Sequence, residues 1–153
     1  MPRFSNQRRV PFSPRQMFDV VADVEQYPRF LPMCESLVVR RREEKGDATV
    51  LTATMGVGYK AIREHFTTRV TLVAPEPRIL VEYLDGPFHH LENRWRFLPA
   101  PTGCVIDFYI EYEFRSKMLG LLMGAMFDKA FHKFSEAFEA RARVVYGGKA
   151  GVT

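Results

Sequence analysis

The feature that most limits how this chain can fold is a long amphipathic segment near its C-terminal end. From about Ser116 to Tyr146, apolar residues recur with the spacing of an α-helix. This apolar stripe consists of Leu119, Leu122, Met123, Met126, Phe127, Ala130, Phe131, Phe134, Ala137 and Phe138. A helix with so broad an apolar face has to bury it against another layer of secondary structure, so the preceding residues must supply that layer.

The residues from Glu35 to Arg115 show the period of two that is typical of β-strands. The last predicted strand places on one face Ile106, Phe108, Ile110, Tyr112 and Phe114. The three strands before it place on their inner faces Leu91, Asn93, Trp95 and Phe97; Ile79, Val81 and Tyr83; and Ile62, Phe66, Val70 and Leu72. Short turns separate the strands, at 45–47, 75–77, 85–87 and 99–103. The pattern predicts an antiparallel meander of about six strands.

The N-terminal residues add a strand and a helix. Phe4 to Val10 leads directly into Ser13-Pro14-Arg15-Gln16, which has the N-cap serine, the first-turn proline and the glutamine of a capping box. Pro28 and Pro32 then bound an irregular apolar stretch, Tyr27 to Met33, which we interpret as a lip or lid. Because the first strand runs into the helix start, we expect no organelle transit peptide here. A cytoplasmic bacterial protein is the simpler interpretation.

Length and composition favour one α+β domain. The chain has 153 residues, of which 46% are hydrophobic and 13% aromatic, and this is enough for one real core. We expect a single domain over residues 1–147 and a flexible tail over 148–153. The net charge of +4 comes from mixed charges of both signs and does not indicate a nucleic-acid binder. Cys34 and Cys104 lack the spacing of a disulfide framework or zinc site, and no stretch is long enough to span a membrane.

Four short motifs suggest chemistry, and each has a simpler structural explanation. His89-His90 lacks a third metal ligand, and strand alternation sends the two side chains to opposite faces. Gly56–Lys60 lacks the context of a phosphate-binding loop, so we expect a turn or bulge between strands. Arg40–Arg42 offers phosphate contacts but is better explained as a solvated hairpin tip. Asp19 and Asp23 share a face of the first helix, where solvent exposure explains them.

The element order and two motifs resemble a known family. Pro28-Arg29-Phe30-Leu31-Pro32 follows the first helix, and Asp85-Gly86-Pro87-Phe88 precedes Leu91-Glu92-Asn93-Arg94-Trp95-Arg96-Phe97. Over nearly its whole length the chain resembles the coenzyme Q-binding protein family, whose members are START-like and polyketide cyclase-like. The resemblance implies a helix-grip fold, with a curved antiparallel sheet wrapped around the long C-terminal helix. The family is implicated in delivering ubiquinone (coenzyme Q) for respiration and includes a ribosome association toxin.

The resemblance and the aromatic inner faces together predict lipid binding in a cavity between sheet and helix. We expect no catalytic residues, no metal and no required cofactor, with ubiquinone or a related polyisoprenoid as the bound ligand. The predicted ligand-binding residues are Phe30, Leu31, Phe66, Tyr83, Phe88, Trp95, Phe97, Phe108, Ile110, Tyr112, Leu122, Met123, Met126 and Phe127. Gly120, Gly124 and the methionines place the cavity at the first half of the helix, where Phe134 and Phe138 would only pack against the sheet.

Two other functions stay open at this stage. A ribosome- or RNA-associated regulator is the first alternative, and a cyclase-like enzyme is the second. An enzyme would need inward acid–base groups, and the inner faces supply mainly Asn93, Tyr83 and Tyr112, with Glu64 as the one candidate carboxylate. We therefore expect a non-enzymatic carrier or chaperone that makes peripheral contact with the inner membrane, with ribosome contact less favoured and no DNA partner.

Overall fold

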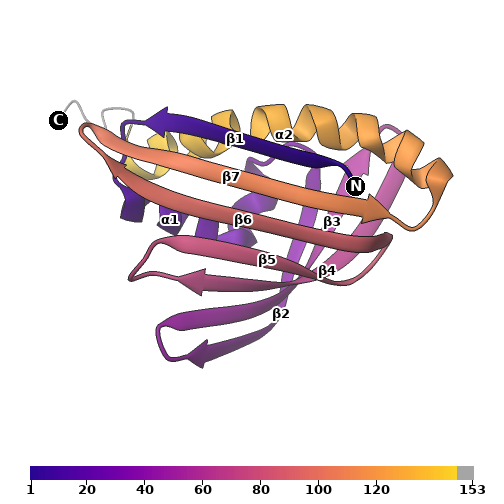
Figure 1. Ribbon diagram of the computed structural model, residues 1–153, viewed down its shortest axis with the longest axis horizontal. Coiled ribbons are helices and arrows are strands. Elements are labelled where there is room, and N and C mark those ends of the chain that lie inside the picture. The colour runs from indigo at the N-terminus through magenta and orange to yellow at the C-terminus, as the bar shows by residue number, and fades with distance from the viewer. Residues whose placement is uncertain (148–153) are drawn as a thin grey trace.

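In the computed structural model, which describes residues 1–147, a curved seven-stranded antiparallel sheet wraps around a long C-terminal helix (Figure 1). The strand order is β1-β7-β6-β5-β4-β3-β2, so the first and last strands of the chain are neighbours. The elements in chain order are β1 (Arg3–Val10), α1 (Pro14–Ala22), the 3-10 helix η1 (Val24–Arg29), β2 (Cys34–Lys45), β3 (Ala48–Tyr59), β4 (Ile62–Val73), β5 (Arg78–Asp85), β6 (Phe88–Ala100), β7 (Gly103–Phe114) and α2 (Lys117–Tyr146). This order confirms the predicted α+β helix-grip architecture. The predicted tail over 148–153 lies outside the described residues.

The first helix begins as its sequence predicts. The Ser13 hydroxyl accepts a hydrogen bond from the Gln16 backbone N–H at 3.1 Å, and the Ser13 backbone N–H donates to the Gln16 side chain at 2.9 Å. These reciprocal bonds satisfy backbone donors that a helix start leaves free. At the far end of the chain, the Tyr146 hydroxyl donates to the Gln16 carbonyl at 2.9 Å, which ties the end of α2 to α1.

The strand alternation seen in the sequence is confirmed. On β6 and β7 the inward residues are buried, including Trp95 and Phe108, which face each other in the register of the two strands. The outward charges pair across the same hairpin, where Arg96 contacts Asp107 at 2.6 Å. One face of the sheet therefore holds the core, and the other meets water.

Polar contacts join the edge strand β1 to the second half of α2. The Asn6 amide donates to the Ser135 hydroxyl at 3.0 Å. The Arg8 guanidinium contacts Glu139 at 2.8 Å, and Arg143 contacts the same carboxylate at 2.7 Å. Both arginines lower the pKa of Glu139, against the effect of its partial burial. These contacts hold the helix across the end of the sheet that β1 and β7 form.

Two local predictions from the sequence are wrong. The first part of the Tyr27–Met33 stretch is not irregular, because η1 covers it up to Arg29. Arg40–Arg42 does not form the tip of a hairpin, because β2 continues to Lys45 and the turn itself lies at Gly46, with a φ of 61°.

The prediction of a turn or bulge at Gly56–Lys60 is confirmed in part. β3 runs to Tyr59, so only Lys60 lies in the turn, with a φ of 56°. The register between β2 and β3 shifts between Cys34 and Ser36, which pair with Val57 and Gly56. A Cβ on Gly56 would lie 2.3 Å from the Ser36 hydroxyl. Glycine here leaves room for the side chains of Ser36 and His65 on the neighbouring strands.

The apolar stripe of α2 is buried or half-buried with one exception. Leu122 was assigned to the inner face, yet it is largely exposed to solvent. It lies at the edge of the helical stripe, and the sheet does not reach around the helix far enough to cover that edge. We expected Gly124 to leave space for a ligand, but a Cβ there would meet no other described part of the protein within 4 Å, so this glycine faces open space.

Candidate functional site

A cavity of about 130 Å³ lies between the inner face of the sheet and α2. Its walls come from η1 and the segment that follows it, from β2 to β7, and from the middle and second half of α2. The residues that line it are Val24, Tyr27, Leu31, Pro32, Met33, Cys34, Leu37, Ala53, Met55, Val57, Phe66, Thr68, Val70, Ile79, Val81, Leu91, Asn93, Trp95, Phe108, Ile110, Met126, Phe127, Ala130, Phe131, Phe134 and Phe138.

The lining contains almost no polar chemistry. Among these residues there is no Asp, Glu, His, Lys or Arg. Asn93 is already engaged, because its side-chain oxygen accepts from the Trp95 indole N–H at 2.8 Å and its amide donates to the Tyr109 carbonyl at 2.9 Å. The Tyr27 hydroxyl donates to the Val21 carbonyl, and burial raises the pKa of this phenol. The cavity is thus suited to an apolar guest and carries no charged group for acid–base chemistry.

Two further uncharged groups lie at the cavity wall. Thr68 is buried on β4 and contributes a hydroxyl. Cys34 contributes a thiol, which makes a weak hydrogen bond to the Ser36 carbonyl at 3.6 Å. Burial raises the pKa of this thiol to about 11, so the side chain is neutral at physiological pH. The single S–H of Cys34 is directed at the Ser36 carbonyl, so the Thr68 hydroxyl is the group at this wall that can donate a hydrogen bond to a carbonyl oxygen of a guest.

One side of the cavity is less enclosed than the rest. Leu37, Met55 and Phe66 are half-buried and lie in a row across β2, β3 and β4, where Leu37 pairs with Met55 and Met55 with Phe66. Met33 and Phe134 are half-buried as well, the first after η1 and the second on α2. The flexible methionines and the ring of Phe134 can shift by rotamer changes.

The structure brings half of the predicted ligand-binding residues to the cavity. The residues that line it are Leu31, Phe66, Trp95, Phe108, Ile110, Met126 and Phe127. Seven others do not line it: Phe30, Tyr83, Phe88, Phe97, Tyr112, Leu122 and Met123. The reverse holds for Phe134 and Phe138, which we expected only to pack against the sheet and which line the cavity instead.

An aromatic cluster explains this displacement. Phe88 is fully buried and stacks on Phe114, with ring centroids 4.6 Å apart, and on Phe127 at 5.7 Å. Tyr83 and Tyr112 meet the same ring edge-on at 5.5 and 6.4 Å. These rings fill the space under the first half of α2, so the gap in the packing lies toward the second half.

The remaining misplaced residues have other neighbours. Phe97 stacks on Trp95 and meets Phe18 of α1 edge-on. Phe30 packs against Tyr27 and lies beneath the Arg141 guanidinium, 5.4 Å from its ring centroid.

Sequence reasoning missed the small residues that make room. Ala53, Thr68 and Ala130 line the cavity from β3, β4 and α2, among much larger neighbours. Strand parity already put Thr68 on the same face as Phe66 and Val70, and helical spacing put Ala130 on the apolar stripe. A search for small inward residues would have located the cavity better than a search for glycines on the helix.

Other kinds of site find little support. Within residues 1–147 no group of three or more His, Cys, Asp or Glu side chains is placed to hold a metal ion. His90 contacts Glu111 at 2.7 Å on the outer face of the sheet, and hydrogen bonds from Tyr109 and His90 lower the pKa of that carboxyl. No helix among the described residues is long and apolar enough to cross a membrane.

Comparison with known proteins identifies relatives over the whole fold. Residues 10–139 match the family model described as polyketide cyclase / dehydrase and lipid transport. The ribosome association toxin RatA of Escherichia coli (strain K12) is 35% identical over 150 residues, covering 97% of this chain and 92% of the toxin. The mitochondrial coenzyme Q-binding protein COQ10 homolog B of Xenopus laevis is 33% identical over 149 residues, covering 94% of this chain and 59% of that protein.

Solved structures agree with the fold. An 18 kDa protein from Caulobacter crescentus is 35% identical and superimposes with a TM-score of 0.80, over 96% of this chain and 99% of that one. A START superfamily protein from Mycobacterium smegmatis superimposes with a TM-score of 0.77 at 19% identity, over 94% and 98% of the two chains. The second likeness shows the START-like fold alone.

Proposed function

Because this chain belongs to the polyketide cyclase / dehydrase and lipid transport family, we propose that it binds ubiquinone or a related polyisoprenoid lipid between its sheet and α2. It would act as a carrier or chaperone that supports respiratory electron transport. The observation that carries this proposal is the apolar cavity around Trp95, Phe108 and Phe138, which lacks any charged side chain. The similarity to a coenzyme Q-binding protein supports the choice of a quinone among apolar ligands.

The size of the cavity limits which part of the lipid it can hold. A dry cavity of about 150 Å³ accommodates one benzene ring in a protein core, and the cavity here measures about 130 Å³. A ring is therefore the largest part that could enter, and the methoxy and methyl groups of a ubiquinone ring would require the lining to move outward. The Thr68 hydroxyl at the cavity wall is a neutral donor for one of its carbonyl oxygens.

The isoprenoid tail must follow the less enclosed side of the cavity, past Met33 and Phe134. Each buried methylene is worth about 0.8 kcal/mol, so a tail left in water would be strongly disfavoured. Because the bilayer offers the tail a similar environment, transfer between membrane and protein would be nearly balanced. Such a balance suits delivery of a lipid better than permanent storage.

The direct test is to identify what the protein carries. The protein would be purified from a respiring bacterium that makes ubiquinone, extracted with organic solvent and analysed by mass spectrometry. We expect a polyisoprenoid quinone in the extract. Trp95 is the one tryptophan of the chain and lines the cavity, so added quinone should quench its fluorescence. Extracts free of polyisoprenoids, together with unquenched fluorescence, would rule out the proposal.

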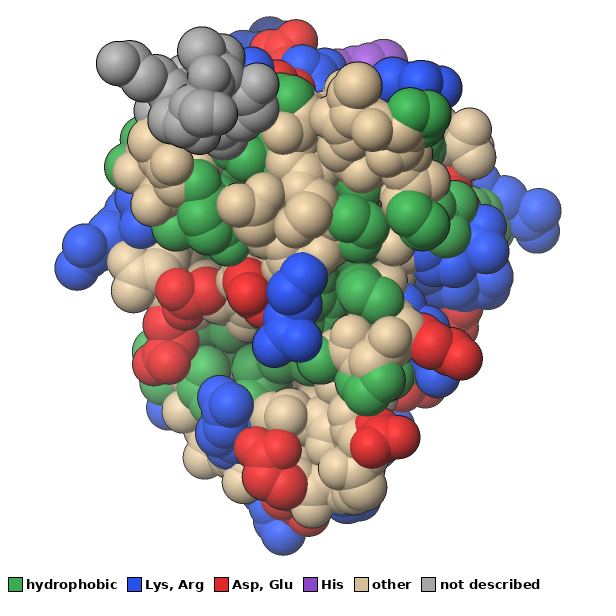
Figure 2. All heavy atoms as spheres, turned by 90° about the vertical axis from the view of Figure 1, so that its left-hand side faces the viewer, with side chains coloured by type: hydrophobic (Ala, Val, Ile, Leu, Met, Phe, Trp, Pro, Cys, Tyr) green, Lys and Arg blue, Asp and Glu red, His purple; other side chains and the backbone are tan. Residues whose placement is uncertain are grey.

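A ribosome-associated regulator is the second candidate, favoured by the toxin RatA relatives, of which one is 36% identical over 96% of this chain. The surface that would contact ribosomal RNA is Arg40–Arg42 on the β2–β3 hairpin. Arg41 and Arg42 contact Glu43 and Glu44 at 2.9 and 3.4 Å, so the positive charge there is partly balanced. On the face shown in Figure 2, basic and acidic side chains are interspersed. Ribosome binding that weakens steeply with added salt would favour this candidate.

A cyclase-like enzyme is the least supported function. The cavity lining offers Thr68, Asn93, Tyr27 and Cys34 as its heteroatom-bearing side chains besides Trp95 and the methionines, and none of them is a charged acid or base. Glu64, the one inward carboxylate suggested by the sequence, does not line the cavity. General acid–base catalysis would need such a group within hydrogen-bonding reach of the guest.

A further inference from the structure

The first two turns of α2 expose large apolar side chains to solvent. Met118 is 71% exposed, Leu121 82% and Leu122 52%. We call these three residues the apolar tip. On the opposite side of the same turns, Leu119 and Met123 pack against the core. This end of α2 is thus apolar nearly all round, although a helix on the surface of a sheet normally turns polar residues outward.

The apolar tip is held firmly rather than frayed. The Ser116 hydroxyl accepts a hydrogen bond from the Leu119 backbone N–H at 3.2 Å and so caps the helix. Phe114 lies beneath the first turns, 3.7 Å from the position of a Cβ on Gly120, and stacks on Phe88. The exposed leucines are therefore presented by a helix whose other face is anchored in the aromatic cluster.

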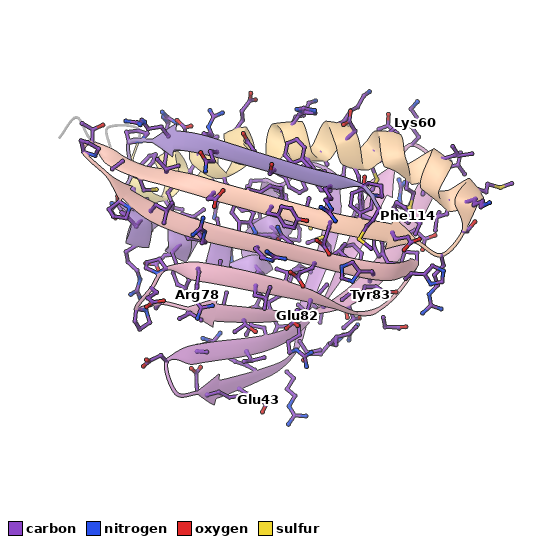
Figure 3. The ribbon with its side chains drawn as sticks, in the orientation of Figure 1. Glu43, Lys60, Arg78, Glu82, Tyr83 and Phe114 are labelled. Carbon is purple, nitrogen blue, oxygen red and sulfur yellow. The ribbon has the colours of Figure 1, made fainter. Side chains whose placement is uncertain are left out.

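Basic residues outnumber acidic ones along the part of α2 that carries the apolar tip. From Arg115 to Lys133 the sequence contains four basic residues, Arg115, Lys117, Lys129 and Lys133, and one acidic residue, Asp128. Lys60 joins them from the β3–β4 turn, because Lys60 and Lys129 both lie over the ring of Tyr59, at 5.3 and 5.8 Å from its centroid. Figure 3 shows Lys60 and Phe114 at the end of the molecule where α2 begins, far from Glu43 on the β2–β3 hairpin.

We propose that the apolar tip and the lysines around it dock the protein on a lipid bilayer that contains anionic headgroups. Leucine and methionine side chains enter the boundary between headgroups and acyl chains, and the lysines pair with the anionic headgroups above it. An RNA surface would instead favour aromatic or arginine side chains that stack on bases, and the apolar tip has neither.

Docking in this way would place one wall of the cavity a single turn of α2 from the apolar tip, while the less enclosed side at Met33 and Phe134 lies further from it. Met126 and Phe127, one turn further along α2 from Leu122, line the cavity. The proposal deepens the proposed function, since a quinone carrier must meet a bilayer, but it can be tested on protein from which all lipid has been removed.

The test compares two double variants on the same helix. Leu121→Glu/Leu122→Glu changes the apolar tip, and Val144→Glu/Val145→Glu changes residues that are 72% and 52% exposed at the other end of α2. Lipid-free protein would be sedimented with vesicles of phosphatidylcholine, with or without phosphatidylglycerol. We expect the tip variant to partition at least about tenfold more weakly, and the valine variant to bind as the unaltered protein does. Because all four positions are exposed, both variants should keep the melting temperature.

A charge variant separates the lysines from the leucines. Lys117→Ala should weaken binding about fivefold on vesicles with phosphatidylglycerol and leave binding to phosphatidylcholine alone unchanged. Lys45→Ala, on the distant β2–β3 hairpin, is the matched control.

The outcomes distinguish this inference from the proposed function. If the protein carries no quinone and only the tip variant binds vesicles more weakly, the proposed function fails and the docking surface stands. Equal vesicle binding by the tip variant and the unaltered protein would overturn the docking surface, whatever the cavity holds. The docking surface would also be overturned if the tip variant lost ribosome binding but kept vesicle binding. It would be overturned as well if the unaltered protein were a dimer and the tip variant a monomer in analytical ultracentrifugation. In either case the apolar tip would contact another macromolecule and not a bilayer.

Discussion

Filling the cavity from α2 should abolish quinone binding without unfolding the protein. Ala130 is buried and lines the cavity between Met126 and Phe134. Ala130→Leu adds three carbon atoms at this wall, which would gain about 2.4 kcal/mol if they filled empty space without strain, at about 0.8 kcal/mol per methylene. Overpacking typically costs about 1 to 3 kcal/mol. The two terms nearly cancel, so we expect the melting temperature to change by no more than about 2 to 4 °C.

For the binding free energy of the quinone, no gain offsets the space that the leucine occupies. The cavity of about 130 Å³ is close to the space that one six-membered ring needs, and a leucine side chain would take up much of it. We expect the affinity for a short-chain ubiquinone, followed by quenching of Trp95 fluorescence, to fall by more than about tenfold, since a loss of about 1.4 kcal/mol is already tenfold. Quinone recovered per mole of purified protein should fall in parallel.

Ala137→Leu is the matched control, since Ala137 is half-buried on the same helix and does not line the cavity. This variant should keep its quinone and its affinity. Unchanged quinone content in Ala130→Leu, or the same loss in Ala137→Leu, would show that the ring does not bind where we place it.

The buried side chains and the helix cap lead to three further predictions. Trp95→Ala should lower the free energy of unfolding by about 3 to 5 kcal/mol in a denaturant titration, because the indole is buried against Phe108 and Phe138; a loss below about 1 kcal/mol would contradict this packing. Burial raises the pKa of both Cys34 and Cys104 to about 11, so both thiols should be alkylated slowly at pH 8 and faster as the pH rises toward 11. Bound quinone should slow the alkylation of Cys34, which lines the cavity, and leave the alkylation rate of Cys104 unchanged. Each rate would be measured in the variant that lacks the other cysteine. Equal protection of both thiols would argue against the site. Ser13→Ala should cost about 0.5 to 2 kcal/mol by removing the α1 cap, whereas Ser5→Ala on the exposed face of β1 should cost little.

The raised pKa values of the two thiols also predict that the free energy of unfolding falls as the pH rises. A thiol that is more basic in the folded than in the unfolded protein holds its proton more tightly when folded. Its contribution to stability is complete below the unfolded value of about 9 and is lost as the pH rises toward about 11. The folded protein should therefore lose stability over that interval, and Cys34→Ala should reduce this loss in melts recorded between pH 8 and pH 11.

The sequence alone determined the elements and their inward faces. A period of two in β6 and β7 and a period of about 3.6 in α2 specify which side chains must leave water, and the capping box at Ser13 marks where α1 begins. These signals are local, because they depend on the chain geometry of neighbouring residues. They sufficed for the order of strand, helix, six strands and long helix and for the inward position of Trp95 and Phe108.

Only the tertiary structure decided where the cavity lies. The position of a gap depends on how side-chain volumes from distant strands add up, and no single stretch of sequence contains that sum. Phe88 closes the space under the first half of α2, whereas Ala53, Thr68 and Ala130 leave space further along. The curvature of the sheet also leaves Leu122 uncovered at the edge of the helical stripe. A residue that local pattern assigned to the ligand therefore lies on the surface, where it forms part of the apolar tip.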